Sequence, residues 1–172
     1  MVQLFFFQDL WKYKAQQDPP LLEAIGEDDS LTVKYLLDHG ADPNSHMAKG
    51  MSALEVAGLE GSTANMKLLL EHGAQLDARD DYNNNALIVA SQYDRLDVVQ
   101  FLISRGIPLD VVATDGGTAL GVAAYEGERK IVSELLRAGV PVAPPPGARS
   151  AIELAKQKGY EEIVKLLENW KN

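Results

Sequence analysis

The chain has 172 residues, no cysteine and a formal net charge of −9. The lack of cysteine excludes both a disulfide framework and a thiolate metal site. The acidic balance is a poor match for nucleic-acid phosphates, which need a basic face, and gives no reason to expect binding to an anionic membrane.

The chain begins with an apolar stretch, MVQLFFFQDLWKYK. No basic residues precede its apolar run and no small-residue cleavage site follows, which argues against a secretory signal. No other window approaches the roughly 20 apolar residues of a membrane span, so we expect a cytoplasmic protein. Within Leu4–Tyr13 we expect a helix that covers the exposed face of the first unit; a dimerisation or partner-docking helix is the alternative.

After this segment, the same landmarks return at a fixed interval. The glycines that follow leucine-rich stretches are Gly40, Gly73, Gly106 and Gly139, each 33 residues after the last. An aliphatic residue followed by alanine three positions later recurs as Leu21/Ala24, Leu54/Ala57, Leu87/Ala90 and Leu120/Ala123, and then as Ile152/Ala155 after 32 residues. A third set is Val33, Met66, Val99, Val132 and Val164. Such periodicity predicts a repeat protein.

Each unit is expected to hold two short helices. The first is typified by TALGVAAYEG, residues 118–127, which ends at Gly127. The second is typified by ERKIVSELLRAG, residues 128–139, whose apolar stripe has helical spacing. Gly139 follows as a left-handed C-terminal cap. One such pair cannot cover its own apolar face, so the pairs should stack.

The start of each first helix resembles the ankyrin repeat signature, Thr-Pro-Leu-His followed two residues later by alanine. The matching stretches are DPPLLEA, MSALEVA, NNALIVA, GTALGVA and RSAIELA. The family's histidine is replaced by Leu22, Glu55, Ile88, Gly121 and Glu153, which should weaken the hydrogen-bonded turn and keep the helical core. The resemblance implies an all-α solenoid of stacked antiparallel helix pairs with β-turn fingers.

We divide the chain into a capping segment, residues 1–17, and five units. The units are residues 18–46, 47–79, 80–112, 113–145 and 146–172. The finger VPVAPPPGARS is one residue short and should be stiffer than the others, because it holds four prolines. The last unit, ending in EEIVKLLENWKN, interleaves apolar and charged residues as a C-terminal cap requires. Because both ends look finished, we expect a complete small protein.

Residues that could carry chemistry have simpler structural roles. His39 and His72 lie just before capping glycines, where a helix C-terminus favours a cation, and further ligands for a metal are lacking. Glu27, Asp28 and Asp29 precede a helix, so Asp28, Asp29 or Ser30 should cap it; an acidic patch for a basic partner and catalysis are the alternatives. DGGT at Asp115 lacks the Lys-Ser/Thr of a phosphate loop and predicts a turn. We therefore expect no enzyme activity, no metal and no cofactor.

The ankyrin resemblance implies that a partner binds on the concave face, through the finger tips and the exposed side of the first helices. The candidate finger residues are Lys49, Met51, Arg79, Asp81, Tyr82, Asn84, Val112, Thr114, Asp115 and Gly117. The candidate helix residues are Leu59, Glu60, Gln92, Tyr93, Tyr125 and Glu126. We expect Tyr93 and Tyr125 to share one solvent-exposed face with Tyr82 on the adjoining finger, because tyrosine is enriched at interface hot spots.

Two classes of function follow. The first is a monomeric, non-catalytic module that binds a partner protein as an adaptor, as an inhibitor, or as an immunity protein that masks a toxin or enzyme. The second is an enzyme or a small-molecule binder. A deep apolar pocket with converging polar groups would favour the second class, and a continuous shallow groove the first.

Overall fold

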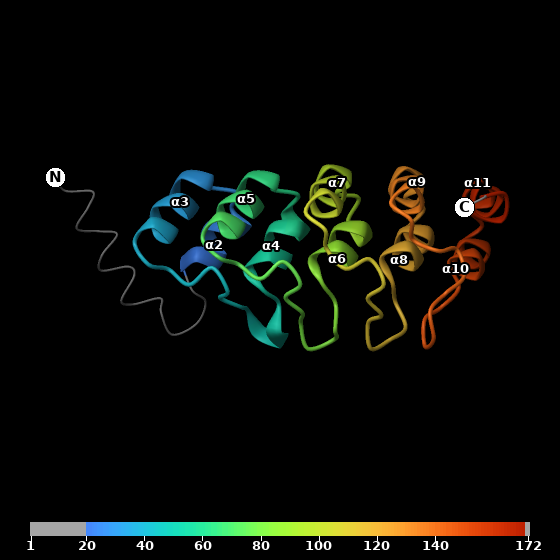
Figure 1. Ribbon diagram of the computed structural model, residues 1–172, viewed down its shortest axis with the longest axis horizontal. Coiled ribbons are helices and arrows are strands. Elements are labelled where there is room, and N and C mark those ends of the chain that lie inside the picture. The colour runs from blue at the N-terminus through green and yellow to red at the C-terminus, as the bar shows by residue number, and fades with distance from the viewer. Residues whose placement is uncertain (1–19, 171–172) are drawn as a thin grey trace.

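The computed structural model describes residues 20–170, which form ten α-helices in five consecutive pairs (Figure 1). The first helices of the pairs are α2 (Pro20–Gly26), α4 (Ala53–Glu60), α6 (Ala86–Gln92), α8 (Ala119–Glu126) and α10 (Ala151–Lys158). The second helices are α3 (Ser30–Asp38), α5 (Thr63–Glu71), α7 (Leu96–Ser104), α9 (Arg129–Arg137) and α11 (Glu161–Glu168). The predicted all-α architecture is confirmed; the expected N-terminal helix lies outside the described residues.

The pairs stand side by side in one row, and the long loops between them project to the same side of the stack (Figure 1). The first helices lie nearer these loops than the second helices do. The loop before α4 also contains one 3-10 turn, η1 (Ala48–Gly50). No helix in residues 20–170 is long and apolar enough to cross a membrane.

Four of the first helices, α4, α6, α8 and α10, begin with the same kind of cap. The side chains of Ser52, Asn85, Thr118 and Ser150 each accept a hydrogen bond from the backbone N–H three residues on. In the second unit Glu55, which replaces the family's histidine, bonds back to Ser52 and completes a capping box.

The first helices end in a left-handed residue. Gly127 takes this role, as predicted, and Gly61 and Gly159 take it in their units. At the equivalent positions of the first and third units, Asp28 and Asp94 adopt positive φ angles of 51° and 53°. After Asp28, Asp29 caps α3 through its side chain, which confirms that capping prediction.

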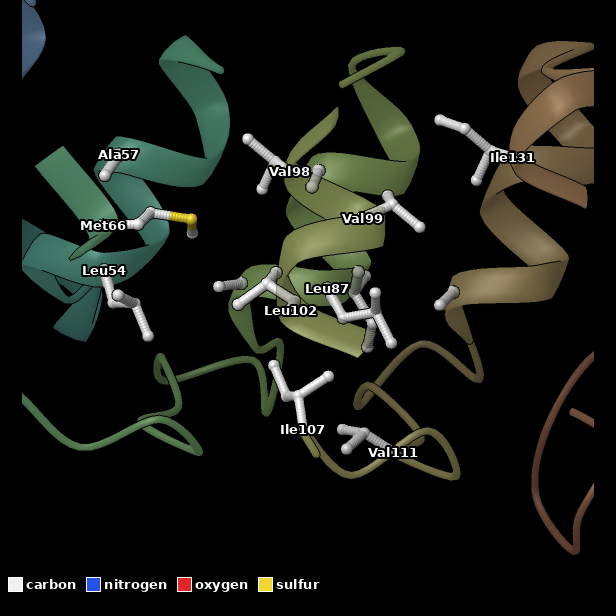
Figure 2. Close-up of a cluster of buried hydrophobic side chains, with 14 of the residues drawn as sticks. Leu54, Ala57, Met66, Leu87, Val98, Val99, Leu102, Ile107, Val111 and Ile131 are labelled. Atoms are coloured by element: carbon white, nitrogen blue, oxygen red, sulfur yellow. The ribbon is translucent and has the colours of Figure 1, made fainter. Parts of the chain in front are cut away.

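The repeated apolar landmarks form one continuous core along the stack. Leu54 and Ala57 on α4 meet Met66 on α5, and Leu87, Val99 and Leu102 repeat this arrangement in the next pair (Figure 2). These side chains are almost completely buried. Fully burying one large apolar side chain contributes about 1.5–3 kcal/mol, so the stack is held together by the contacts that pass from each pair to the next.

Each of the central loops is a short hairpin-like finger. The hydrogen bonds that close the fingers run from Met47 N to Met51 O, from Asp80 N to Asn84 O and from Ala113 N to Gly117 O, at 2.8, 3.2 and 2.8 Å. DGGT forms the turn of the third of these fingers, as predicted.

Neighbouring fingers are also bonded to one another. Asp81 N donates to Lys49 O at 3.0 Å, Thr114 N to Tyr82 O at 2.8 Å and Arg149 N to Gly116 O at 2.9 Å. The fingers therefore form a connected edge of the molecule, which positions their side chains relative to the first helices.

Candidate partner-binding cleft

A partly open cleft of about 440 Å³ lies between the fingers and the first helices of the last three pairs. Its lining residues are Tyr82, Asn84, Ile88, Gln92, Ala113, Thr114, Asp115, Gly117, Val122, Tyr125, Glu126, Arg149 and Leu154. Helices α6, α8 and α10 supply the base, and three successive fingers supply the outer wall. The lining mixes apolar and polar side chains.

The base of the cleft is apolar. Ile88 on α6, Val122 on α8 and Leu154 on α10 line it. Gly121 lies beside α10 here, since a Cβ atom added at Gly121 would come within 3.4 Å of Leu154 Cδ1. Other units carry a larger side chain at this position, such as Ile88 in α6. Gly121 has no such side chain, which leaves more space between α8 and α10.

Asp80 organises the finger that carries Tyr82 and Asn84. Its Oδ1 atom accepts hydrogen bonds from the backbone N–H of Tyr82 at 2.9 Å and of Asn84 at 2.8 Å. Its Oδ2 atom accepts one from Asn84 Nδ2 at 2.9 Å. In the same finger, Asn83 adopts a positive φ of 61° and donates from Nδ2 to Val112 O at 2.7 Å. The finger is thus held in one shape from both sides.

Asp115 and Arg149 join the two fingers at the other side of the cleft. Arg149 Nη2 donates to Asp115 Oδ2 at 2.8 Å, and Asp115 Oδ1 accepts from Gly117 N at 2.8 Å. Gly116, which lies between Asp115 and Gly117 in the sequence, has a φ of +82°. A Cβ atom at Gly116 would lie 2.9 Å from Gly147 O. Only glycine fits this approach without strain.

The two tyrosines that line the cleft each carry a lysine over the ring. Lys49 Nζ lies 5.7 Å from the ring centroid of Tyr82, and Lys158 Nζ lies 4.4 Å from that of Tyr125. Tyr82 is exposed, with 46% of its surface accessible, whereas Tyr125 is half-buried. The expectation that Tyr125 is freely accessible is therefore met only in part, because Lys158 covers its ring.

Carboxylates gather where α8 ends beside the cleft. Burial raises the pKa of Glu128, and the adjacent carboxyl of Asp94 raises it further through a hydrogen bond and through its charge. The charge of Glu126, which lines the cleft, adds to this effect.

The cleft brings together many of the residues predicted from the repeat register. Those that line it are Tyr82, Asn84, Gln92, Thr114, Asp115, Gly117, Tyr125 and Glu126. Those that lie outside it are Lys49, Met51, Leu59, Glu60, Arg79, Asp81, Tyr93 and Val112. Some of the second set have structural partners: Arg79 pairs with Asp77 at 2.9 Å, and the Leu59 carbonyl accepts from Arg95 Nε at 2.7 Å.

Tyr93, expected to share a face with Tyr125, does not line the cleft that Tyr125 lines. Tyr93 is the C-cap residue of α6 and is 49% exposed. In the 33-residue register, Tyr93 is equivalent to Glu126. The residue equivalent to Tyr125 is Gln92, which does line the cleft. A shift of one residue turns a side chain by about 100° around a helix, which is enough to direct Tyr93 elsewhere.

Sequence reasoning missed the contributions of the last unit. Arg149 occupies the position equivalent to Asn84 and Gly117, once the one-residue shortening of its loop is counted. Leu154 is in the same way equivalent to Val122. The register therefore contained the signal for both residues, but the predicted site stopped one unit too early.

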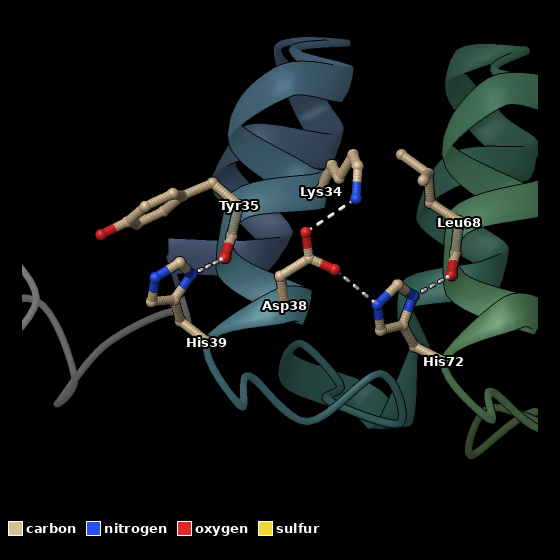
Figure 3. Close-up of polar contacts among 6 residues, drawn as sticks. All are labelled: Lys34, Tyr35, Asp38, His39, Leu68 and His72. Atoms are coloured by element: carbon tan, nitrogen blue, oxygen red, sulfur yellow. Dashed lines mark hydrogen bonds and ion pairs between the residues drawn. The ribbon is translucent and has the colours of Figure 1, made fainter.

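The two equivalent histidines occupy helix ends, as expected (Figure 3). His39 Nδ1 lies 2.7 Å from Tyr35 O, and His72 Nδ1 lies 2.9 Å from Leu68 O. His72 Nε2 also reaches Asp38 Oδ1 in the preceding unit at 3.1 Å. The bond to the Leu68 carbonyl, followed by that to Asp38, raises the pKa of His72. Residues 20–170 contain no group of three or more His, Cys, Asp or Glu placed to hold a metal ion.

Comparison with known proteins agrees with the repeat architecture. Residues 21–115, more than half of the chain, match the family model for ankyrin repeats in three copies. Comparison with curated proteins finds none that matches the chain. Ankyrin repeats generally mediate protein–protein interactions and are typically non-enzymatic. The match, together with the stacked helix pairs and their fingers, shows that the chain belongs to the ankyrin repeat family.

Proposed function

We propose that the protein is a non-catalytic module that binds a partner protein on its concave face, at the cleft between the fingers and α6, α8 and α10. The observation that carries the proposal is that three successive units direct two tyrosines and an apolar base into one open space. Aromatic side chains dominate interface energetics because they bury a large rigid surface and keep a polar tip.

The size of the cleft is compatible with the side chains of a partner protein. A volume of about 440 Å³ lies near the lower end of the roughly 300–1,000 Å³ that small-ligand pockets span. It can admit one or two side chains of a partner, while the exposed finger residues Lys49 and Asp81 extend the contact. We further propose that α8–α9 and α10–α11 are repeats of the same family, because the 33-residue landmarks continue through them, and that the stack acts as a monomer.

Replacing the two tyrosines of the cleft tests the proposal. Tyr82→Ala with Tyr125→Ala should weaken capture of the natural partner at least about tenfold, since tenfold is 1.4 kcal/mol and one interface hot spot is worth about 2 kcal/mol or more. Tyr93→Ala is the matched control, because Tyr93 is equally exposed and lies outside the cleft. Quantitative affinity capture from the source cells would measure the loss, and thermal melts would confirm that both variants fold.

Equal capture by the double variant and the wild type would remove the cleft from the interface. A comparable loss in Tyr93→Ala would instead place the contact on the neighbouring surface.

A further inference from the structure

The charges that line the cleft do not balance. Asp115 and Arg149 pair with each other at 2.8 Å, so their charges cancel. Glu126 also lines the cleft and is half-buried, and no cation of the described chain forms an ion pair with it. One carboxylate therefore remains in the cleft without a counter-charge.

The basic residues Arg95, Arg129 and Lys158 each make a contact of their own, and none of these contacts is with Glu126. Arg95 donates from Nε to the Leu59 carbonyl at 2.7 Å, and Arg129 faces Glu162 at 3.8 Å. Lys158 lies over the ring of Tyr125. The charge of Glu126 is close enough to Glu128 to contribute to the raised pKa of that residue, after burial and Asp94. A half-buried carboxylate that lines a cleft without a counter-charge favours an incoming cation.

The aromatic walls also favour a cation. Lys49 and Lys158 of the chain itself lie over the rings of Tyr82 and Tyr125, so both rings already interact with positive charge, and a partner's cation would share or displace these contacts. Such contacts contribute about 0.5–1 kcal/mol at exposed sites and more when they are desolvated. Between the rings, the apolar base of Ile88, Val122 and Leu154 suits an aliphatic chain.

We propose that the cleft receives a lysine or arginine side chain of the partner protein. The alkyl stem lies on the apolar base between Tyr82 and Tyr125, and the cationic head pairs with Glu126. Long basic side chains bury their stems in this way while the charge meets a polar group. The inference rests on the proposed function, and it adds the chemistry of the residue that the partner contributes.

A random-peptide phage library selected on the immobilised protein provides the probe. The selected peptides should share a lysine or arginine next to apolar residues. For a synthetic peptide of that sequence, replacement of the shared basic residue by glutamine should lower the affinity at least about tenfold. Glu126→Gln in the protein should cause a similar loss, and added salt should weaken binding to the wild type more than to this variant.

Glu60→Gln is the matched control. Glu60 occupies the position equivalent to Glu126 two units earlier, is exposed and lies outside the cleft. The Glu60→Gln variant should bind the peptide as tightly as the wild type does, although it loses the same charge as Glu126→Gln. A uniform loss in both variants would mean that the net charge of the protein, and not a basic residue in the cleft, drives binding, and would overturn the inference.

The remaining outcomes separate the inference from the proposed function. Selected peptides that need Tyr82 and Tyr125 but share no basic residue, or that bind Glu126→Gln normally, would refute the basic occupant and leave the cleft as the binding site. Peptides that ignore the tyrosine changes, or a selection that yields no binder, would count against both.

Discussion

Glu55 offers a direct test of how the stack responds to pH. Its side chain is 0% exposed, and its Oε2 atom accepts hydrogen bonds from Ser52 N at 2.8 Å and from Ser52 Oγ at 2.7 Å. Its Oε1 atom is buried without a hydrogen-bond partner in the described structure. Burial raises the pKa of Glu55 to about 7. The hydrogen bonds from Ser52 oppose this rise in part, and the charge of Asp80 adds to it.

The expected magnitude follows from this pKa. The change from the ordinary value of 4.5 to about 7 is worth roughly 3 kcal/mol, since one pKa unit is about 1.36 kcal/mol. An acid whose pKa is raised on folding does not reduce the free energy of unfolding at a pH below its unfolded pKa. The free energy of unfolding then falls as the pH rises from the unfolded pKa through the folded pKa. The wild type should therefore lose roughly 3 kcal/mol between about pH 4.5 and pH 8 from this residue alone.

Glu55→Gln should remove this loss, because glutamine remains neutral. The variant should match the wild type near pH 4.5 and exceed it by roughly 3 kcal/mol near pH 8.5, which is about 6–12 °C in Tm for a chain of this size. Thermal and urea unfolding followed by circular dichroism would measure the difference. Glu153→Gln is the control, because Glu153 holds the equivalent position in α10 but is exposed.

Parallel pH profiles for the wild type and Glu55→Gln would refute the reasoning. They would mean that the carboxyl group ionises freely and that water or a rearranged loop reaches it. A similar change in Glu153→Gln would show that the effect belongs to surface charge and not to burial.

Two further substitutions test contacts between neighbouring units. The raised pKa of His72 implies a stabilising contribution that is complete below about pH 6.5 and is lost as the pH rises through the folded value. His72→Gln should therefore flatten the fall in Tm between about pH 5.5 and pH 8.5. Gly127→Ala should lower Tm more than Gly139→Ala: both sites have φ near +90°, but only the new Cβ at Gly127 would meet Tyr160 Cζ, at 2.7 Å.

The helix pairs and their ends were predictable because they depend on local chemistry that recurs. The glycine that follows each second helix, such as Gly139, adopts a positive φ. The landmark residues Leu120 and Ala123 recur because their positions are buried. A repeat supplies several independent copies of each signal, so an ambiguous copy is corrected by the others. Asp94 shows the limit: it adopts the left-handed conformation of its glycine counterparts, although its residue type favours this conformation far less.

The cleft was harder to predict because it depends on contacts between units. The register shows that Tyr125 corresponds to Gln92, but it does not show that Lys158 of the next unit covers its ring. Nor does it show that the absence of a side chain at Gly121 brings Leu154 to the base. Such features arise from pairs of positions in different units, and a single sequence provides only one example of each pair.

The sharing of the cleft among three helix pairs also affects how the stack comes apart. Pairs in a linear array are stabilised only by their immediate neighbours, so those near an end can open one after another. An occupant that contacts α6, α8 and α10 together connects the third pair to the fifth, which do not otherwise adjoin. Release of the terminal pair would then require loss of the occupant as well. Partner binding should thus convert stepwise fraying of the C-terminal half into a single cooperative transition.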